Sequence, residues 1–254
     1  TSSSPAALDD LAKARRFAAE DADLLLDVTR AYDDRAMSRE TIATARDVLR
    51  LAPASLDAAL LLGDALSGEG DAQGAAQAYE HALTHRLDAV DALVGAGLAY
   101  LELGRAEDAI TMLRRAVSVD PDRGDAHARL AETLLARGRP AEAAQSFREV
   151  VRLAPGDADA WLALGRIQLD LGDAARAADA IEHAVAIRPD DADALLLLAT
   201  AREKLGKPAD RLSALEQAHK ARPDDVEAAA RYGEALAESG DADLEVDMIR
   251  RAGA

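Results

Sequence analysis

The sequence predicts an all-α protein, an α-solenoid built from antiparallel helical hairpins, and three observations carry this prediction. First, prolines recur on a lattice of 34 residues, with Leu87 standing where one is missing: Pro53, Pro121, Pro155, Pro189 and Pro223. Second, glycines recur on the same period: Gly70, Gly104, Gly138, Gly172, Gly206 and Gly240. Third, aromatic residues make up only 3% of a chain that is 49% hydrophobic, so alanine and leucine must form a core of closely packed helices.

Each recurring residue type has a mechanical role in a hairpin. A proline ends one helix, because it lacks the backbone N–H and disfavours helix at the residue before it. Four residues later an acid followed by alanine lies in the first turn of the next helix, where it meets the positive end of the helix dipole. The glycine closes that helix in the left-handed conformation. Pro140 and Pro208, two residues past their glycines, suit the first turn of a second helix.

The elements follow in order along the chain. Residues 1–21 contain a half-repeat or capping helix, because Ala7, Leu11, Ala14 and Phe17 have second-helix spacing. The repeat array covers residues 22–241 as the units 22–55, 56–89, 90–123, 124–157, 158–191 and 192–225, followed by the first helix of a last unit at 226–241. Residues 242–254 match the pattern poorly and are expected to form a C-terminal capping helix. The half-repeat and the absence of an initiator methionine indicate a portion of a longer parent chain.

The unit that begins at Ala158 carries the most complete pattern. Positions 4, 7, 8, 11, 20, 24, 27 and 32 of that unit are Trp161, Leu164, Gly165, Gln168, Ala177, Ile181, Ala184 and Pro189. The pattern resembles the tetratricopeptide repeat (TPR), and the resemblance implies a right-handed superhelix with a concave groove lined by the first helices. If Trp161 is buried as the pattern implies, its replacement by alanine should cost about 3–5 kcal/mol.

Departures from the repeat pattern gather near the chain ends. Position 20, which is alanine in the pattern, is Thr41, Arg211 and Glu245 in the first, sixth and seventh units, and Ala36 replaces the first glycine. Terminal repeats that meet solvent are commonly atypical, so these residues are expected to belong to end units.

A candidate partner-binding groove is predicted on the side of each first helix that lies opposite the core positions 4, 7, 8 and 11. Position 5 is apolar in every unit: Leu26, Leu60, Val94, Ala128, Leu162, Leu196 and Ala230. The predicted groove residues are Leu60, Val94, Leu98, Leu101, Glu102, Glu132, Leu135, Leu162, Arg166 and Leu169. Such a surface suits an apolar or amphipathic segment of a protein partner, with basic flanks to match the mostly negative charge. Alternatively, the leucines are half-buried between neighbouring first helices.

Other chemistry finds little support. A net charge of −17 argues against nucleic acid and anionic membranes as partners, and no apolar run reaches membrane-spanning length. There is no cysteine, and His81 and His85 in "HALTH" lack the glutamate and the third ligand of a zinc site. The glycine-rich stretches 68–74 and 95–99 follow no strand, so they do not fit a nucleotide loop. No cofactor, metal or enzymatic activity is expected, and the asparagine and lysine of the carboxylate-clamp TPR subset are absent.

The sequence therefore predicts a protein–protein interaction scaffold. Two alternatives stay open: a self-assembling structural protein in which the half-repeat or last unit of one copy docks on another, and a regulatory portion of a larger enzyme. Arginine outnumbers lysine 26 to 4, which indicates a GC-rich, bacterial genome. The missing methionine and cysteines favour an envelope-facing setting, periplasmic or on a membrane-anchored parent, over the cytoplasm.

Overall fold

A computed structural model of the chain describes residues 5–239, and these residues form α-helices joined by short loops, without a strand. The chain divides into two compact units, Thr1–Thr133 and Leu134–Ala254. The prediction of an all-α protein is confirmed. The boundary between the units falls inside one helix, so it does not coincide with a repeat boundary of the sequence.

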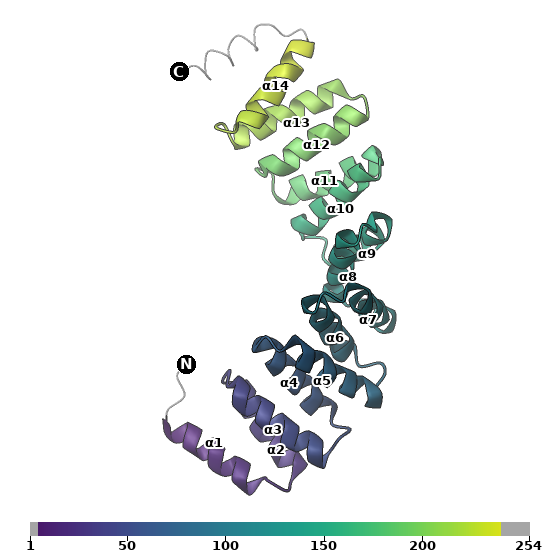
Figure 1. The fold of residues 1–254 in the computed structure, drawn as a ribbon. Coiled ribbons are helices and arrows are strands. Elements are labelled where there is room, and N and C mark those ends of the chain that lie inside the picture. The colour runs from purple at the N-terminus through teal and green to yellow at the C-terminus, as the bar shows by residue number, and fades with distance from the viewer. Residues whose placement is uncertain (1–4, 240–254) are drawn as a thin grey trace. The chain divides into compact units, whose positions relative to one another are not determined.

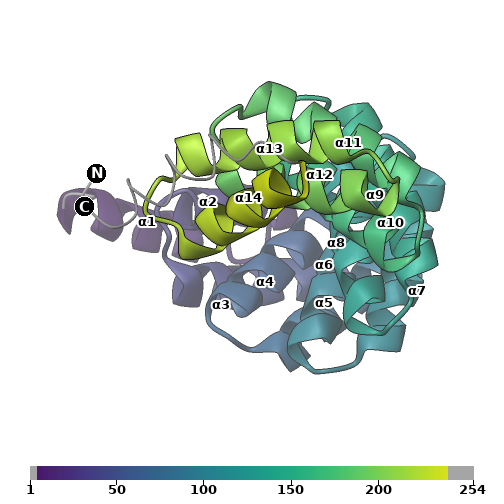
Figure 2. The same ribbon diagram turned by 90° about the horizontal axis from the view of Figure 1, so that it is seen from above.

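The first unit contains seven complete described helices and the start of an eighth, drawn from purple to dark teal in Figure 1. Their bounds are α1 (Pro5–Phe17), α2 (Ala22–Asp33), α3 (Ser38–Leu51), α4 (Leu56–Gly68), α5 (Ala72–His85), α6 (Val90–Glu102), α7 (Ala106–Val119) and α8 (Gly124–Ala136). Consecutive helices α2 with α3, α4 with α5 and α6 with α7 pack as hairpins, and each hairpin packs on the next (Figures 1 and 2). This is the predicted stacking of helical hairpins.

The second unit repeats this arrangement. Its described helices after α8 are α9 (Pro140–Leu153), α10 (Ala158–Asp170), α11 (Ala174–Ile187), α12 (Ala192–Lys204), α13 (Pro208–Ala221) and α14 (Val226–Ser239). The pairs α10 with α11 and α12 with α13 form its hairpins. The expected capping helix at 242–254, and with it Gly240 and Glu245, lies outside the described residues.

Several first helices begin at an N-cap residue that the repeat pattern did not include. The side chains just before five first helices accept backbone N–H groups of the first turn: Asp21, Ser55, Asp157, Asp191 and Asp225. These N-caps satisfy donors that the helix itself leaves unpaired. The backbone hydrogen bond from Ala228 lowers the pKa of the Asp225 carboxyl, although burial opposes this shift. The acid that is followed by alanine therefore stands two residues after the N-cap residue.

Helix ends follow the predicted glycine rule. Five glycines at the ends of first helices adopt the left-handed conformation, with φ of 79°, 71°, 68°, 81° and 66° at Gly70, Gly104, Gly138, Gly172 and Gly206. Ala36, which replaces glycine in the first repeat, adopts the same conformation at φ 53°. The turn geometry is therefore kept even where the residue type resists it.

The cores depend on a small residue facing a large one within each hairpin. A Cβ placed on Gly97 would lie 2.9 Å from Leu113 Cγ in the first unit, and one on Gly165 would lie 2.5 Å from Ile181 Cγ1 in the second. Leu113 and Ile181 are fully buried. Position 8 is therefore small because the second helix of the same repeat lies directly against it.

Trp161 differs from the expectation of a buried anchor, because it is only half-buried. Its Nε1 donates a hydrogen bond to the Pro155 carbonyl at 3.0 Å, and its ring stacks on His183 with centroids 4.3 Å apart. His127 Nε2 makes the equivalent contact to the Pro121 carbonyl at 3.0 Å, one repeat earlier. Since part of the indole stays in water, the cost of replacing Trp161 is expected to be smaller than the value for a buried tryptophan.

Two polar residues that replace the alanine of the pattern at position 20 form polar contacts in the structure. Thr41 is fully buried and donates its hydroxyl to the Met37 carbonyl at 3.1 Å. Arg211 is 9% exposed and pairs with Glu238 at 2.6 Å and Glu203 at 4.0 Å. Both polar side chains are therefore accommodated where the pattern has alanine.

Candidate protein-binding surface

In the first unit, the apolar residues predicted for the groove lie closer to the core than expected. Val94 is buried at 7% exposure. Leu60, Leu98 and Leu101 are half-buried and pack against the buried core of this unit. The physical reason is that first helices contact one another, α2 with α4 and α4 with α6, which covers position 5.

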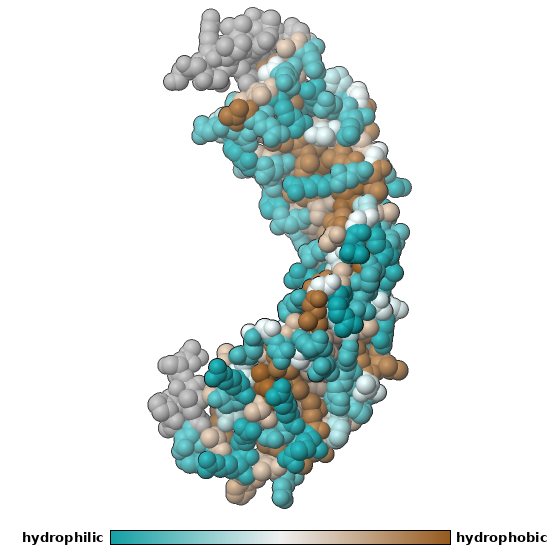
Figure 3. All heavy atoms as spheres, in the orientation of Figure 1, coloured by the Kyte–Doolittle hydropathy of each residue, from teal (hydrophilic) through white to brown (hydrophobic). Residues whose placement is uncertain are grey.

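The second unit shows the same trend. Leu162 is buried at 8% exposure, and Leu169 is half-buried against the core. Leu135 is 37% exposed. Val94 and Leu162 are therefore buried, and the alternative of leucines half-buried between first helices describes Leu60, Leu98, Leu101 and Leu169. That these residues bind a partner stays a prediction. In the view of Figure 3, hydrophilic side chains cover most of the surface and hydrophobic patches lie between them.

The charged groove residues are all exposed. Glu132 pairs with Arg129 at 3.1 Å, so its charge is already balanced on α8. Glu102 and Arg166 form no ion pair with other residues of the described range 5–239. Of the predicted charges, these two are the ones left open for a partner.

The acids at position 2 of the first helices form ion pairs with arginines, and the repeat pattern did not predict these pairs. The pairs are Arg30 with Asp57, Arg123 with Asp91 and Asp125, Arg188 with Asp159, Arg222 with Asp193, and Arg231 with Glu227. Most of these arginines come from the following repeat junction, about 30 residues away in sequence. Arginines that recur at the repeat junctions, Arg123, Arg188 and Arg222, are the feature of the sequence from which these ion pairs could have been predicted. Most of these ion pairs join neighbouring repeats. Because the acids are paired, they add little unbalanced negative charge to the surface.

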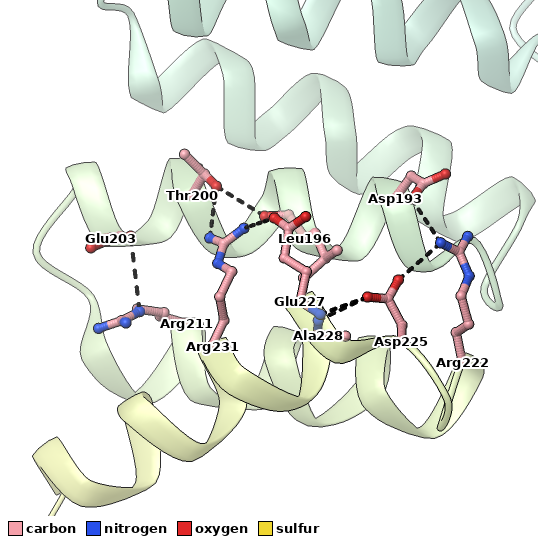
Figure 4. A network of polar contacts seen from close by, with 10 residues as sticks. All are labelled: Asp193, Leu196, Thr200, Glu203, Arg211, Arg222, Asp225, Glu227, Ala228 and Arg231. Carbon is pink, nitrogen blue, oxygen red and sulfur yellow. Dashed lines mark hydrogen bonds and ion pairs between the residues drawn. The ribbon is translucent and has the colours of Figure 1, made fainter.

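Figure 4 shows this fastening at the end of the second unit. Arg222 bridges Asp193 of α12 at 3.1 Å and Asp225 at the start of α14 at 3.0 Å. Arg231 of α14 donates to the Thr200 hydroxyl of α12 at 2.9 Å. Two neighbouring first helices, α12 and α14, are thus joined by polar side chains.

A different group of acids in the first unit has no cationic partner within residues 5–239. Asp33 and Asp34 end α2, Asp64 lies on α4 and Glu102 ends α6. Burial, and then the charges of Asp64 and Asp34, raise the pKa of the Asp33 carboxyl above its ordinary value. Asp33, Asp34 and Asp64 therefore share one region and repel one another, and Glu102 lies near enough to Tyr79, the partner of Asp64, to raise the pKa of its phenol.

Tyr79 of α5 contacts this acidic region, a role that the repeat pattern did not predict. Its ring lies between Gly63 and Gly95, where an added Cβ would come within 2.5 Å of the ring at either glycine. Its hydroxyl donates to Asp64 Oδ1 at 2.5 Å. Burial and this hydrogen bond raise the pKa of Tyr79 well above its usual range, so the phenol stays protonated and keeps Asp64 in place.

Tyr100 forms a second anchored phenol on α6. It donates to Glu80, and its ring carries the Arg105 guanidinium 4.4 Å from the centroid. Burial and the hydrogen bond raise the pKa of Tyr100 to about 12. This contact ties α6 to α5 and to the loop that starts α7.

Metal and membrane sites were also sought over residues 5–239. The rings of His81 and His85 lie edge to face with centroids 5.1 Å apart, and His81 Nε2 contacts the Pro53 carbonyl at 2.7 Å. This range contains no group of three or more metal-ligating side chains. None of the described helices has the length and apolar character needed to cross a bilayer.

Comparison with known proteins agrees with the repeat pattern. The family model described as tetratricopeptide repeat matches residues 94–158, 129–192, 162–212 and 196–254, which together cover more than half of the chain. A comparison with curated proteins finds no match to the chain.

Solved structures share the fold. YrrB, described as "a TPR protein with an unusual peptide-binding site", is 21% identical, with a TM-score of 0.64, over 72% of this chain and 95% of its own. Pseudomonas aeruginosa pilF is 21% identical with a TM-score of 0.58 over 85% and 97%. A Naa15/Naa10 complex bound to HypK-THB is 17% identical with a TM-score of 0.67 over 91% of this chain and 36% of its own. The repeats support a protein–protein interaction scaffold, and the chain belongs to the tetratricopeptide repeat family.

Proposed function

We propose that the chain binds a basic, amphipathic segment of a protein partner on the first-helix side of its repeats, and that its role is binding rather than catalysis. The observation that carries this proposal is the set of carboxylates without cationic partners in the first unit, beside half-buried leucines. We name Asp33, Asp64, Leu98, Leu101 and Glu102 the acidic–apolar face.

Charge supports a basic partner. Most other acids on the first helices are already paired with arginines, so the unpaired carboxylates of this face are the ones whose repulsion a bound cation would relieve. Leu98 and Leu101 leave part of their side chains in solvent, which allows them to accept a few apolar anchors. YrrB, a protein of the same fold, is described as having an unusual peptide-binding site, which is consistent with this role.

The second unit offers a smaller apolar surface whose unpaired charge is positive, so it suits the apolar part of the segment and not its basic part. Leu169 is half-buried, Leu135 is exposed and Arg166 has a free charge within the described residues. In this proposal buried Val94 supports the face of the first unit, and buried Leu162 supports the surface of the second unit. Leu60 and Glu132 border the acidic–apolar face of the first unit in the same proposal.

The test is a pair of helical peptides with the same leucines at i, i+3 and i+7, one carrying arginine and the other glutamate at the remaining positions. Fluorescence anisotropy against the full chain should show binding of the arginine peptide alone, with affinity that falls as salt rises. The double variant Asp33→Asn/Glu102→Gln should weaken it about threefold to thirtyfold, since exposed charge pairs contribute about 0.3–1 kcal/mol each.

The matched control removes two exposed acids elsewhere, in Asp88→Asn/Asp179→Asn, and should leave the affinity unchanged. If both double variants weaken binding equally, the net charge attracts the peptide and the acidic–apolar face is not the site. Equal binding of the two peptides would also contradict the proposal.

A further inference from the structure

Two histidines on α5 take no part in the acidic–apolar face. His81 and His85 occupy positions 26 and 30 of the second repeat, about one helical turn apart, so they lie on the same side of the helix. Their rings lie edge to face with centroids 5.1 Å apart. His85 is exposed and His81 is half-buried, so small solutes can reach the pair.

The packing of the repeats does not account for this pair. In the other units between residues 22 and 225, position 30 is aliphatic: Leu51, Val119, Leu153, Ile187 and Ala221. The fifth repeat also has a histidine at position 26, but the ring of His183 stacks on Trp161 and its position 30 is Ile187. The second repeat is therefore the one whose sequence places two imidazoles at these positions.

A carbonyl group from the preceding repeat junction fixes the proton of His81. The Nε2 atom of His81 lies 2.7 Å from the Pro53 carbonyl oxygen. Because a carbonyl oxygen can only accept a hydrogen bond, Nε2 carries the proton and Nδ1 keeps its lone pair. Histidines that bind metals commonly donate their other ring N–H to a backbone carbonyl or a carboxylate. His81 therefore already has the hydrogen bond that orients a metal-binding imidazole.

The separation of the two rings suits a shared ion. Two imidazoles that bind one tetrahedral ion through nitrogens at about 2.1 Å have ring centroids about 5 Å apart. The rings of His81 and His85 have this separation, and the exposed ring of His85 can turn a nitrogen toward the ion. His85 is also the last residue of α5, and the partial negative charge at a helix C-terminus favours a cation.

We propose that His81 Nδ1 and a ring nitrogen of His85 bind one divalent transition-metal ion of the Zn²⁺, Ni²⁺ and Cu²⁺ class, with water in the remaining coordination positions. Imidazole suits these ions, whereas Mg²⁺ and Ca²⁺ prefer oxygen ligands. Within residues 5–239 no third metal-ligating side chain joins the pair, so the site differs from the closed four-ligand sites of structural zinc. It lies on a second helix and does not depend on the proposed function.

Isothermal titration calorimetry of the untagged full chain with ZnCl₂ tests this site, in about 0.5 M sodium chloride to screen the acidic surface. One ion should bind per chain, and His81→Gln and His85→Gln should each weaken its binding at least about tenfold. His183→Gln is the matched control, because it removes a histidine from the same repeat position outside the pair, and it should leave the affinity unchanged. Electron paramagnetic resonance of the chain loaded with Cu²⁺ should show coupling to two imidazole nitrogens.

Circular dichroism first establishes that each variant is folded. Zn²⁺ should raise the melting temperature of the parent chain but not that of His85→Gln, because the ion binds the folded pair. Equal affinity in the parent and in both variants of the pair means an adventitious ion only and overturns the assignment, as does coupling of Cu²⁺ to fewer than two nitrogens. Asp33→Asn/Glu102→Gln should leave zinc binding unchanged, and a loss of binding in that variant would place the ion at the acidic–apolar face instead.

Discussion

Ala36 shows how a single residue departs from the repeat at a cost in stability. Within residues 5–239 it is the non-glycine residue with positive φ, at 53°, and it occupies the place of the helix-ending glycines. The left-handed conformation brings Cβ close to the backbone of an L-residue, which costs about 1–2 kcal/mol. The repeat therefore dictates the turn, and Ala36 carries the strain.

We expect Ala36→Gly to raise the free energy of unfolding by about 1 kcal/mol, because glycine adopts this conformation without a steric penalty but loses more entropy on folding. Urea denaturation followed by circular dichroism measures the change. Gly104→Ala, at φ 71° with open space around the site, is the reverse control and should destabilise the chain by a similar amount. A loss of stability in Ala36→Gly would show that the turn is not strained.

Asp33 carries a second residue-scale prediction, on pH. Because the folded-state pKa of Asp33 is raised, the folded chain binds a proton there more tightly than the unfolded chain does. Ionisation therefore removes stability as pH rises from the ordinary aspartate value through the folded pKa. Asp33→Asn should stabilise the chain by about 0.5 kcal/mol near pH 7 and have little effect near pH 3. Urea titrations at both pH values test this, and an equal gain at both would rule out the charge as the cause.

At the scale of elements, each hairpin depends on a small residue facing a large one. Gly165 on α10 has no space for a methyl group beside Ile181 of α11, and the Ala177 carbonyl lies 3.4 Å from the same point. Neighbouring first helices are then fastened by arginines to the position 2 acids. The two helices of a hairpin thus pack closely at a small residue, whereas arginine side chains form the ion pairs between one repeat and the next.

Gly165→Ala should therefore cost about 1–3 kcal/mol through overpacking. Ile181→Ala alone also destabilises the chain, but in the double variant the new methyl occupies the space that Ile181 leaves. A double-mutant cycle should give a favourable coupling of about 1 kcal/mol. Gly156→Ala, with no heavy atom within 4 Å of the added Cβ, is the control and should change stability by less than about 0.5 kcal/mol. Strict additivity in the cycle would contradict direct contact between the two positions.

At the scale of the whole molecule, the negative net charge destabilises the folded chain, and ion pairs between repeats offset part of this repulsion. The chain carries −17, yet arginines balance the first-turn acids of most first helices. The remaining carboxylates, such as Asp33 and Asp64, are excess charge. Self-repulsion of this kind destabilises a compact state and is screened by salt.

Raising sodium chloride from about 0.05 M to about 0.5 M should therefore increase the free energy of unfolding, because screening relieves repulsion more than it weakens exposed ion pairs. Thermal unfolding at several salt concentrations measures this. Sodium perchlorate at the same ionic strengths separates screening from specific anion effects. A steady fall in the melting temperature would mean that the arginine pairs outweigh the repulsion.

The sequence by itself determined the period, the hairpins, the helix ends at the glycines and the absence of strands, because these depend on residues within one or two helical turns. Tertiary structure alone decided which side of each first helix stays exposed. Val94 and Leu162 are covered by first helices one repeat away, and the partners of Asp91 and Asp159 lie about 30 residues along the chain. The place of Tyr79 between two glycines is likewise a product of its neighbours. Local periodicity specifies a helix, but burial and ion pairing are set by the helices packed against it.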